Sequence, residues 1–297
     1  PVLKTTFADP SIIQVNKTYY SFATAGPGIY GIQIAKSDDF HKWEHLKHDA
    51  LPHTGTWVNH AAGRGSGVAP DVQQMADGSF VLYYTACINK QTPHKNTKCV
   101  GAATSKTIEG PYTPEAAPLA CHLSQGGAID ISGFHDPTTH DQYVLYKVDG
   151  NNAGHGGLCM NMIPPIQATP IMLQKVTPNG LTAIGTPIQI LDRDDTDGPL
   201  VEAPMLRKYG NKYVLFFSSN CFSSPGYDVS YAVADNITGP YRKASEPLFA
   251  YGKLGLDGPG GASVTTDGSK MVFHGHYSVK GQGMTRVLYT QEIKFDG

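Results

Sequence analysis

The sequence is poor in charge, in basic clusters and in long apolar runs. Only 16% of its 297 residues are charged, against about 25% in typical soluble domains. Its 23 basic and 25 acidic side chains nearly cancel and form no Lys/Arg run, which argues against nucleic-acid partners and against a membrane-surface footprint. The longest apolar run extends only from Val81 to Ile88, far short of the roughly 20 residues that cross a bilayer. We therefore expect no nucleic-acid and no membrane partner.

Cysteine is scarce and shows no C-x-x-C pair or nearby histidine spacing typical of a metal site. The five cysteines cannot all pair. Cys87 and Cys99 flank a polar loop between two apolar runs, and this spacing predicts a disulfide at the tip of a hairpin. The remaining three are expected to be buried or paired: Cys121, Cys159 and Cys221.

The start of the chain and two short motifs favour an extracellular protein. The sequence begins at Pro1 without an initiator methionine or a hydrophobic leader, which fits a processed secretory protein or a chain trimmed at its start. N-x-[ST] tripeptides at Asn16 and Asn236 fit glycosylation on exposed turns. We therefore expect a secreted protein.

Turn-forming and β-forming residues are abundant. The chain has 33 glycines, 21 prolines and 16 tyrosines. Aromatic and branched side chains suit the pleated, half-buried surface of a sheet, and Gly and Pro suit the turns between strands. This composition predicts an all-β fold.

A weak repeat divides the chain into five units. Each unit has a short apolar run, a polar turn and a second apolar run rich in Tyr or Phe, at 19–22, 80–84, 143–146, 213–217 and 271–274. A Gly-Pro-Tyr tripeptide recurs at 110–112 and at 239–241. A period of roughly 60 to 70 residues holds about four short strands. The pattern predicts one domain over residues 1–297, a five-bladed β-propeller with four antiparallel strands per blade, and a β-sandwich or jelly roll is the alternative.

Four acids lead the first four units: Asp9, Asp71, Asp130 and Glu202. The first strand of each propeller blade lines the central channel, so Asp9, Asp130 and Glu202 are expected to converge there. Neighbouring buried carboxylates push their pKa values apart and supply an acid and a base in one site, as cleavage of a glycosidic bond requires. Taken singly, each acid could instead accept N–H bonds in a turn.

The motifs Phe-Ala-Asp-Pro at 7–10, Ala-Pro-Asp-Val at 69–72, Ile-Asp at 129–130 and Val-Glu-Ala-Pro at 201–204 resemble glycoside hydrolase family 43 over essentially the full chain. The resemblance implies a five-bladed propeller that hydrolyses arabinose- or xylose-containing plant polysaccharides with inversion. It implies that Asp9 is the general base, that Glu202 is the general acid, and that Asp130 raises the pKa of that acid and orients it. The invertase-like relatives carry Arg-Asp-Pro and Glu-Cys-Pro elements that do not match.

Five further residues are expected to contact substrate: Trp57, Asp71, Phe134, His274 and Arg286. Arg286 resembles an arginine that reaches the floor of the active site in the family. The indole of Trp57 could stack on a sugar ring, with core packing as the alternative. Asp71 is expected to be structural rather than catalytic.

One departure from the family concerns a metal. Many members carry a histidine in a Gly-Pro-Gly-His pattern that holds a central calcium or sodium ion, whereas this chain reads Gly-Pro-Gly-Gly at 258–261. No metal ligand is therefore predicted and no cofactor is expected to be required. His274 and His276 lie one strand later and could line the same channel, which leaves a central ion open.

The sequence is thus interpreted as a monomeric, inverting exo-α-L-arabinofuranosidase that acts on plant arabinan or arabinoxylan. Exo action is expected because long loops at 87–99 and 150–165 could enclose a pocket. The alternatives are an endo-1,5-α-L-arabinanase, a β-xylosidase or an exo-galactanase of the same family. A sugar-binding lectin is the non-enzymatic alternative, but a lectin would repeat the same contact residues in every blade.

Overall fold

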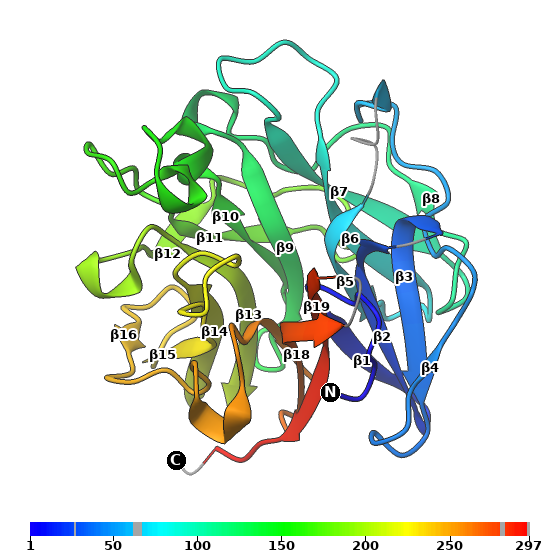
Figure 1. Ribbon diagram of the computed structural model, residues 1–297. Helices are drawn as coiled ribbons and strands as arrows, with labels where there is room; N and C mark the ends of the chain where they lie inside the picture. Colours follow the sequence, from blue (N-terminus) through cyan, green and yellow to red (C-terminus); the bar gives the residue numbers. More distant parts are fainter. Residues whose placement is uncertain (27, 62–66, 280–282, 296–297) are drawn as a thin grey trace.

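The computed structural model describes residues 1–26, 28–61, 67–279 and 283–295. Five antiparallel sheets surround a common centre (Figure 1). The first strands of successive sheets contact one another in a closed ring. The predicted all-β, five-bladed propeller is therefore confirmed.

The blades follow one another along the chain. The first contains β1 (Ser11–Val15), β2 (Thr18–Gly26), β3 (Ile29–Ser37) and β4 (Glu44–His45). The second contains β5 (Val68–Gln74), β6 (Phe80–Cys87), β7 (Lys98–Ser105) and β8 (Thr113–Pro114). The third contains β9 (Ala128–His135), β10 (Gln142–Val148), β11 (Ile171–Val176) and β12 (Ile188–Leu191). The fourth contains β13 (Val201–Tyr209), β14 (Lys212–Ser219), β15 (Ser230–Ala234) and β16 (Arg242–Lys243).

The fifth blade closes the ring with both ends of the chain. It contains β17 (Gly260–Val264), β18 (Lys270–Val279) and β19 (Gly283–Glu292). The N-terminal segment runs beside β19, where the Val2 N–H donates to Leu288 O and the Phe7 N–H donates to Arg286 O, both at 2.8 Å. The fifth blade thus has three regular strands, and the start of the chain covers its edge. Short 3-10 turns lie in the connections: η2 (Leu123–Gln125), η3 (Gly150–Ala153), η4 (Leu158–Met160), η5 (Asp195–Asp197) and η6 (Lys253–Gly255).

Five hydrophobic clusters hold the blades together, one at each interface between neighbouring blades. Strand β6 shows why its sequence reads as a continuous apolar run. Val81 and Tyr83 pack toward the third blade, while Leu82 and Tyr84 pack toward the first. Successive strand residues point to opposite faces, and here both faces are buried.

The predicted Cys87–Cys99 disulfide is wrong. Cys99 pairs with Cys121 and Cys159 pairs with Cys221, while Cys87 is free. In the β6–β7 ladder Cys99 lies opposite Ala86, one position away from Cys87. A shift of one residue turns a strand side chain to the other face of the sheet, so the two thiols cannot meet.

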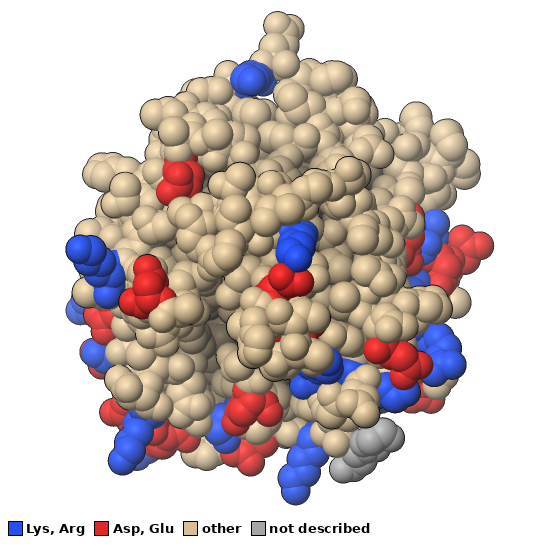
Figure 2. Space-filling model, turned by 180° about the vertical axis from the view of Figure 1, so that it is seen from behind, with Lys and Arg blue, Asp and Glu red and all other residues tan. Residues whose placement is uncertain are grey.

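The low charge content is visible on the surface. On the face in Figure 2 the Lys, Arg, Asp and Glu side chains gather toward the lower edge and the sides, and the upper part carries few of them. Among the described residues no helix is long and apolar enough to cross a membrane.

Candidate active site

The five inner strands share a backbone feature that aims side chains into the centre. At corresponding points one residue has a positive φ: Asp9 (54°), Ala69 (45°), Asp130 (57°), Ala203 (52°) and Gly261 (60°). In the second to fifth blades the ladder register shifts at this point. Such bulges redirect side chains beside functional sites.

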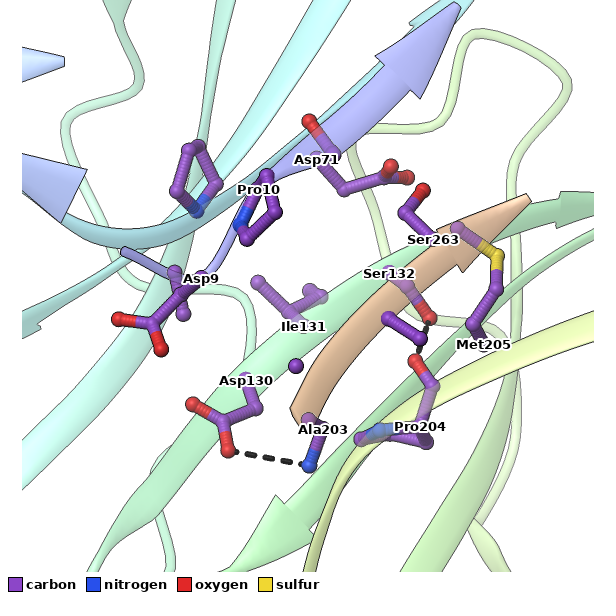
Figure 3. A pocket seen from close by; sticks show the side chains of 15 residues that line it. Asp9, Pro10, Asp71, Asp130, Ile131, Ser132, Ala203, Pro204, Met205 and Ser263 are labelled. Carbon is purple, nitrogen blue, oxygen red and sulfur yellow. Dashed lines mark hydrogen bonds between the residues drawn. The ribbon is translucent and has the colours of Figure 1, made fainter. Parts of the chain in front are cut away.

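The bulge corrects the predicted alignment of the acids. Asp9 and Asp130 occupy the positive-φ position itself, whereas Glu202 lies one residue before Ala203 and Asp71 lies two residues after Ala69. The four acids are therefore not equivalent. Figure 3 shows Asp9 and Asp130 toward one end of the central channel and Asp71 toward the other.

Asp9 is held as a carboxylate. Its Oδ1 accepts a hydrogen bond from Arg286 Nη1 at 2.6 Å, and its Oδ2 accepts one from Thr24 Oγ1 at 2.7 Å. Burial alone would raise the pKa of Asp9, but the charge of Arg286 and these hydrogen bonds more than offset it and keep the pKa below its ordinary value. An ionised carboxylate fixed in this way can accept a proton.

Asp130 and Glu202 form an interacting acid pair. Asp130 Oδ2 accepts the Ala203 N–H at 3.1 Å (Figure 3), which places Asp130 beside the residue that follows Glu202. Burial, and then the charge of Glu202, raise the pKa of Asp130 to about 8. The pair therefore holds one proton between its two carboxyl groups near neutral pH.

Two buried side chains bind Glu202. Lys147 Nζ lies 2.9 Å from Glu202 Oε2, and the Tyr227 hydroxyl donates to Glu202 Oε1 at 2.9 Å. Burial opposes the charge of Lys147, but Glu202 and Asp149 hold the pKa of Lys147 above its ordinary value. Burial raises the pKa of Tyr227 well above its ordinary value, so the phenol stays a donor. Sequence reasoning missed Lys147 and Tyr227.

The three acids open onto one pocket of about 350 Å³. Arg286, Lys147 and Tyr227 line it together with Asp9, Asp130 and Glu202. Cys159 and Phe222, which come from loops of the third and fourth blades, form part of its wall, and the Cys159–Cys221 disulfide links these loops. The pocket thus contains the two groups that hydrolysis needs. The carboxylate beside a cation can act as the base, and the carboxyl pair that shares a proton can act as the acid.

Asp71 lies outside this pocket and lines a narrow cavity of about 40 Å³ in the central channel. Its Oδ2 accepts hydrogen bonds from Gly133 N and Gln73 Nε2, and burial raises its pKa. Asp71 is absent from the wall of the larger pocket. The predicted contact of Asp71 with substrate is therefore wrong, and the hydrogen bond from Gly133 N connects the second and third blades.

His274 is fully buried and stacks on Tyr227 with ring centroids 5.7 Å apart. Its Nδ1 accepts the Asp9 N–H at 3.1 Å, and burial lowers its pKa to about 3. A neutral ring that accepts at Nδ1 carries its hydrogen on Nε2 and has no lone pair left for a metal. A Cβ at Gly261 would lie 2.9 Å from the His274 ring, so the ring fills the space beside this glycine.

The residues do not fit the central ion that the resemblance left open. Within the part of the chain that the structure describes, no three His, Cys, Asp or Glu side chains cluster to hold a metal. Both ring nitrogens of His276 have other partners, with Nε2 2.8 Å from Phe222 O and Nδ1 3.2 Å from Asp257 Oδ1. His274 is thus a support for Asp9 rather than a metal ligand or an exposed substrate contact.

Two predicted substrate contacts are wrong because the side chains lie in the core. Trp57 is 6% exposed and stacks on Tyr84 at the interface of the first and second blades. Phe134 is 3% exposed and packs edge-on against Tyr213 between the third and fourth blades. Of the predicted contacts, Arg286 is the one that both lines the pocket and binds a catalytic candidate.

Asp130→Asn is expected to stabilise the protein while it lowers activity. Because the folded-state pKa of Asp130 is about 8 and its ordinary value is 3.8, the folded protein holds a proton that the unfolded chain has lost between these values. This group therefore reduces stability progressively as pH rises through that window. Thermal unfolding should show a higher Tm for the variant at about pH 8 and a smaller gain at about pH 5, whereas a pH-independent difference would contradict the assignment.

Several proteins of named function are similar in sequence to this chain. Extracellular endo-α-(1→5)-L-arabinanase of Thermotoga petrophila is 28% identical over 78% of this chain, and the match spans 50% of that protein. Extracellular endo-α-(1→5)-L-arabinanase 1 of Bacillus subtilis is 25% identical over 94% of this chain and 83% of its own length. A β-xylosidase of the same organism is 27% identical over 82% of this chain and 41% of its own length. The chain thus spans only about half of several relatives.

Solved structures share the fold. A thermostable family-43 glycoside hydrolase superposes with a TM-score of 0.76 at 25% identity and covers 100% of this chain and 92% of its own. A native Bacillus subtilis arabinanase superposes with a TM-score of 0.72 at 20% identity, over 98% of this chain and 95% of its own. The model of glycosyl hydrolases family 43 matches residues 1–297. With its propeller and its converging acids, the chain belongs to glycosyl hydrolases family 43.

Proposed function

We propose that this chain hydrolyses α-1,5-linked L-arabinan with inversion at the anomeric carbon. The observation that carries the proposal is the convergence of Asp9, Asp130 and Glu202 on one pocket. The arabinan substrate is supported by relatives whose names state endo-arabinanase activity. Because several relatives are longer than this chain, the activity of the whole protein is part of the proposal.

In the proposed reaction Asp9 takes a proton from water while Glu202 gives a proton to the leaving oxygen. Asp9 can do so because Arg286 keeps it ionised. Asp130 and Glu202 hold one proton near neutral pH, and Tyr227 and Lys147 orient the Glu202 carboxyl group. Inversion requires roughly 6.5–9.5 Å between base and acid so that the water fits between Asp9 and the sugar.

We propose internal cleavage of the chain rather than the exo action expected from the sequence. The curated relatives at 25–28% identity include endo-acting arabinanases, and none of those described above is named as an exo-arabinofuranosidase. One observation favours the exo alternative, because the disulfide-linked loops that carry Cys159 and Phe222 wall part of the pocket. The size of the first products decides between the two modes.

The test compares debranched arabinan, aryl α-L-arabinofuranoside and aryl β-D-xyloside. Endo action predicts a rapid fall in arabinan viscosity and release of oligosaccharides, while exo action predicts arabinose alone with a slow fall in viscosity. Proton NMR of the first product is expected to show the inverted anomer. Cleavage of the xyloside alone would refute the arabinan proposal, and sugar binding without any hydrolysis would favour a lectin.

We further propose that the protein acts outside the cell. The two arabinanases described above are named as extracellular enzymes, and four of the five cysteines form two disulfides in the structure. Disulfides persist mainly in oxidising compartments. Both sequon asparagines, Asn16 and Asn236, are exposed in turns, as glycosylation requires.

A further inference from the structure

One position recurs on the second strand of every blade and faces the next blade. In each blade the inner-strand residue two places after the positive-φ residue pairs with a residue of the second strand. The recurring position lies two residues further along that second strand. The residues at this position are Thr24, Thr85, Lys147, Ser218 and His274.

Four of these side chains accept the N–H of the positive-φ residue in the next blade. The bonds are Ala69 N–H to Thr24 Oγ1 (2.9 Å), Asp130 N–H to Thr85 Oγ1 (3.0 Å), Gly261 N–H to Ser218 Oγ (2.9 Å) and Asp9 N–H to His274 Nδ1 (3.1 Å). Each hydrogen bond satisfies a strained backbone group and ties two blades together. A hydroxyl or a neutral imidazole can act in this way because both have a lone pair.

Lys147 is the exception, because an ammonium group has no lone pair and cannot accept a hydrogen bond. The corresponding N–H, that of Ala203, donates instead to Asp130 Oδ2 at 3.1 Å. The carboxylate of Asp130 thus takes the place of the missing acceptor. This contact keeps Asp130 next to the backbone of the residue that follows Glu202.

The ammonium group of Lys147 forms ion pairs with two carboxylates. Its ammonium is fully buried, 2.9 Å from Glu202 Oε2 and 3.3 Å from Asp149 Oδ1. Asp130 on β9 also acts on it electrostatically. A buried lysine is tolerated only when its charge is paired in this way. A lysine at this position of the blade therefore depends on the acidic side chains around it.

We propose that Lys147 is a positioning residue for the acid pair: it diverts the Ala203 N–H to Asp130, binds Glu202 directly, and thereby holds the two carboxyl groups in their relation to each other. This inference rests on hydrolysis by these acids and not on the identity of the sugar. Lys147 acts through Asp130 and Glu202 and is not itself a proton donor to substrate.

Lys147→Thr is the central variant, because threonine occupies the same position in the first and second blades. Its hydroxyl can accept the Ala203 N–H and release Asp130. Lys147→Met is the matched control, since it removes the charge without supplying an acceptor. We expect kcat to fall about 100-fold in the Thr variant, as for a displaced catalytic group, and less in the Met variant, with KM within about threefold in both.

The pH profile separates positioning from a purely structural role. Asp149 from the end of β10, Glu202 from β13 and Asp130 from β9 face Lys147, and Asp9 also acts on Asp130. Because Lys147 lowers the proton affinity of Asp130, its removal is expected to move the alkaline limb of kcat/KM to higher pH. Unchanged profiles with kcat within threefold of wild type, or a rise in KM alone, would overturn the proposal.

A double variant and a measurement that needs no substrate complete the test. Lys147→Met with Asp149→Asn removes one uncompensated carboxylate and replaces the single variants if they do not fold. Tm measured from about pH 5 to about pH 9 needs no substrate: the loss of Tm with rising pH should be larger in the Met variant than in wild type, because Asp130 holds its proton to higher pH. Parallel Tm curves would overturn the inference, whereas a wild type that cleaves no glycoside counts only against the proposed function.

Discussion

Glu202→Gln is expected to lower kcat on arabinan by about 10³-fold, which is within the usual contribution of general acid catalysis. Glutamine keeps an oxygen that can accept from Lys147 or Tyr227, the two groups that bind Glu202 in the structure. It has no acidic proton to give to the leaving oxygen. Initial rates on arabinan, with circular dichroism and Tm as controls for folding, measure the effect.

The leaving group provides the sharper control for Glu202. The leaving group of an aryl arabinofuranoside is a phenolate, which departs with little help from an acid when the phenol is acidic. Hydrolysis of this substrate should therefore be impaired much less than that of arabinan. A sugar alkoxide cannot depart without protonation. Equal losses on both substrates would show that Glu202 is not the proton donor, and an unchanged rate on arabinan would show that it is not needed.

Asp9→Asn is expected to lower kcat by about 10³-fold on every substrate, whatever the leaving group. The amide cannot accept a proton from water, although it retains an oxygen that can bind the Thr24 hydroxyl. It also leaves Arg286 without its charged partner. Rates on arabinan and on the aryl glycoside should therefore fall in parallel, which distinguishes the base from the acid.

Azide gives an independent test of the role of Asp9. The azide anion needs no deprotonation, so it can attack the anomeric carbon from the side of the missing base while Glu202 protonates the leaving oxygen. The expected product of the Asp9→Asn variant is a glycosyl azide of inverted configuration, formed at a rate that increases with azide concentration. Azide rescue of Glu202→Gln with the same product, and no rescue of Asp9→Asn, would exchange the two assignments.

The propeller could be predicted from the sequence because its signals are local. Turn residues, alternating apolar runs and the recurrence of both depend on neighbours in the chain. Conversely, the register of the acids could not be predicted, because it depends on where the positive-φ residue falls in each blade. Asp71 lies two residues beyond the bulge position and Glu202 lies one residue before it. Asp9 and Asp130 share the positive-φ position and line the pocket, whereas Asp71 lies outside it.

The errors in the substrate contacts have a similar cause. The sequence predicts Trp57 near the sugar because an indole can stack on a sugar ring, and it predicts Phe134 as a further contact. Whether an aromatic side chain faces a pocket or a neighbouring blade depends on which blade packs against it, and both rings lie in clusters between blades. Lys147 could have been noticed, since aligning the second strands places a lysine where the other blades carry Thr, Ser or His.

The sequence by itself determined the strands, the five-fold repetition and the three acids, because pattern and residue type are properties of the chain. The tertiary structure alone decided how the acids divide the work. Asp9 meets Arg286 across the closure of the ring, and Lys147 meets Glu202 across two blades, at sequence separations of 277 and 55. Burial alone would raise the pKa of Asp9, but the charge of Arg286 and the hydrogen bonds to the carboxylate together outweigh it, while burial and the charge of Glu202 raise the pKa of Asp130. These influences exist only once the blades are assembled.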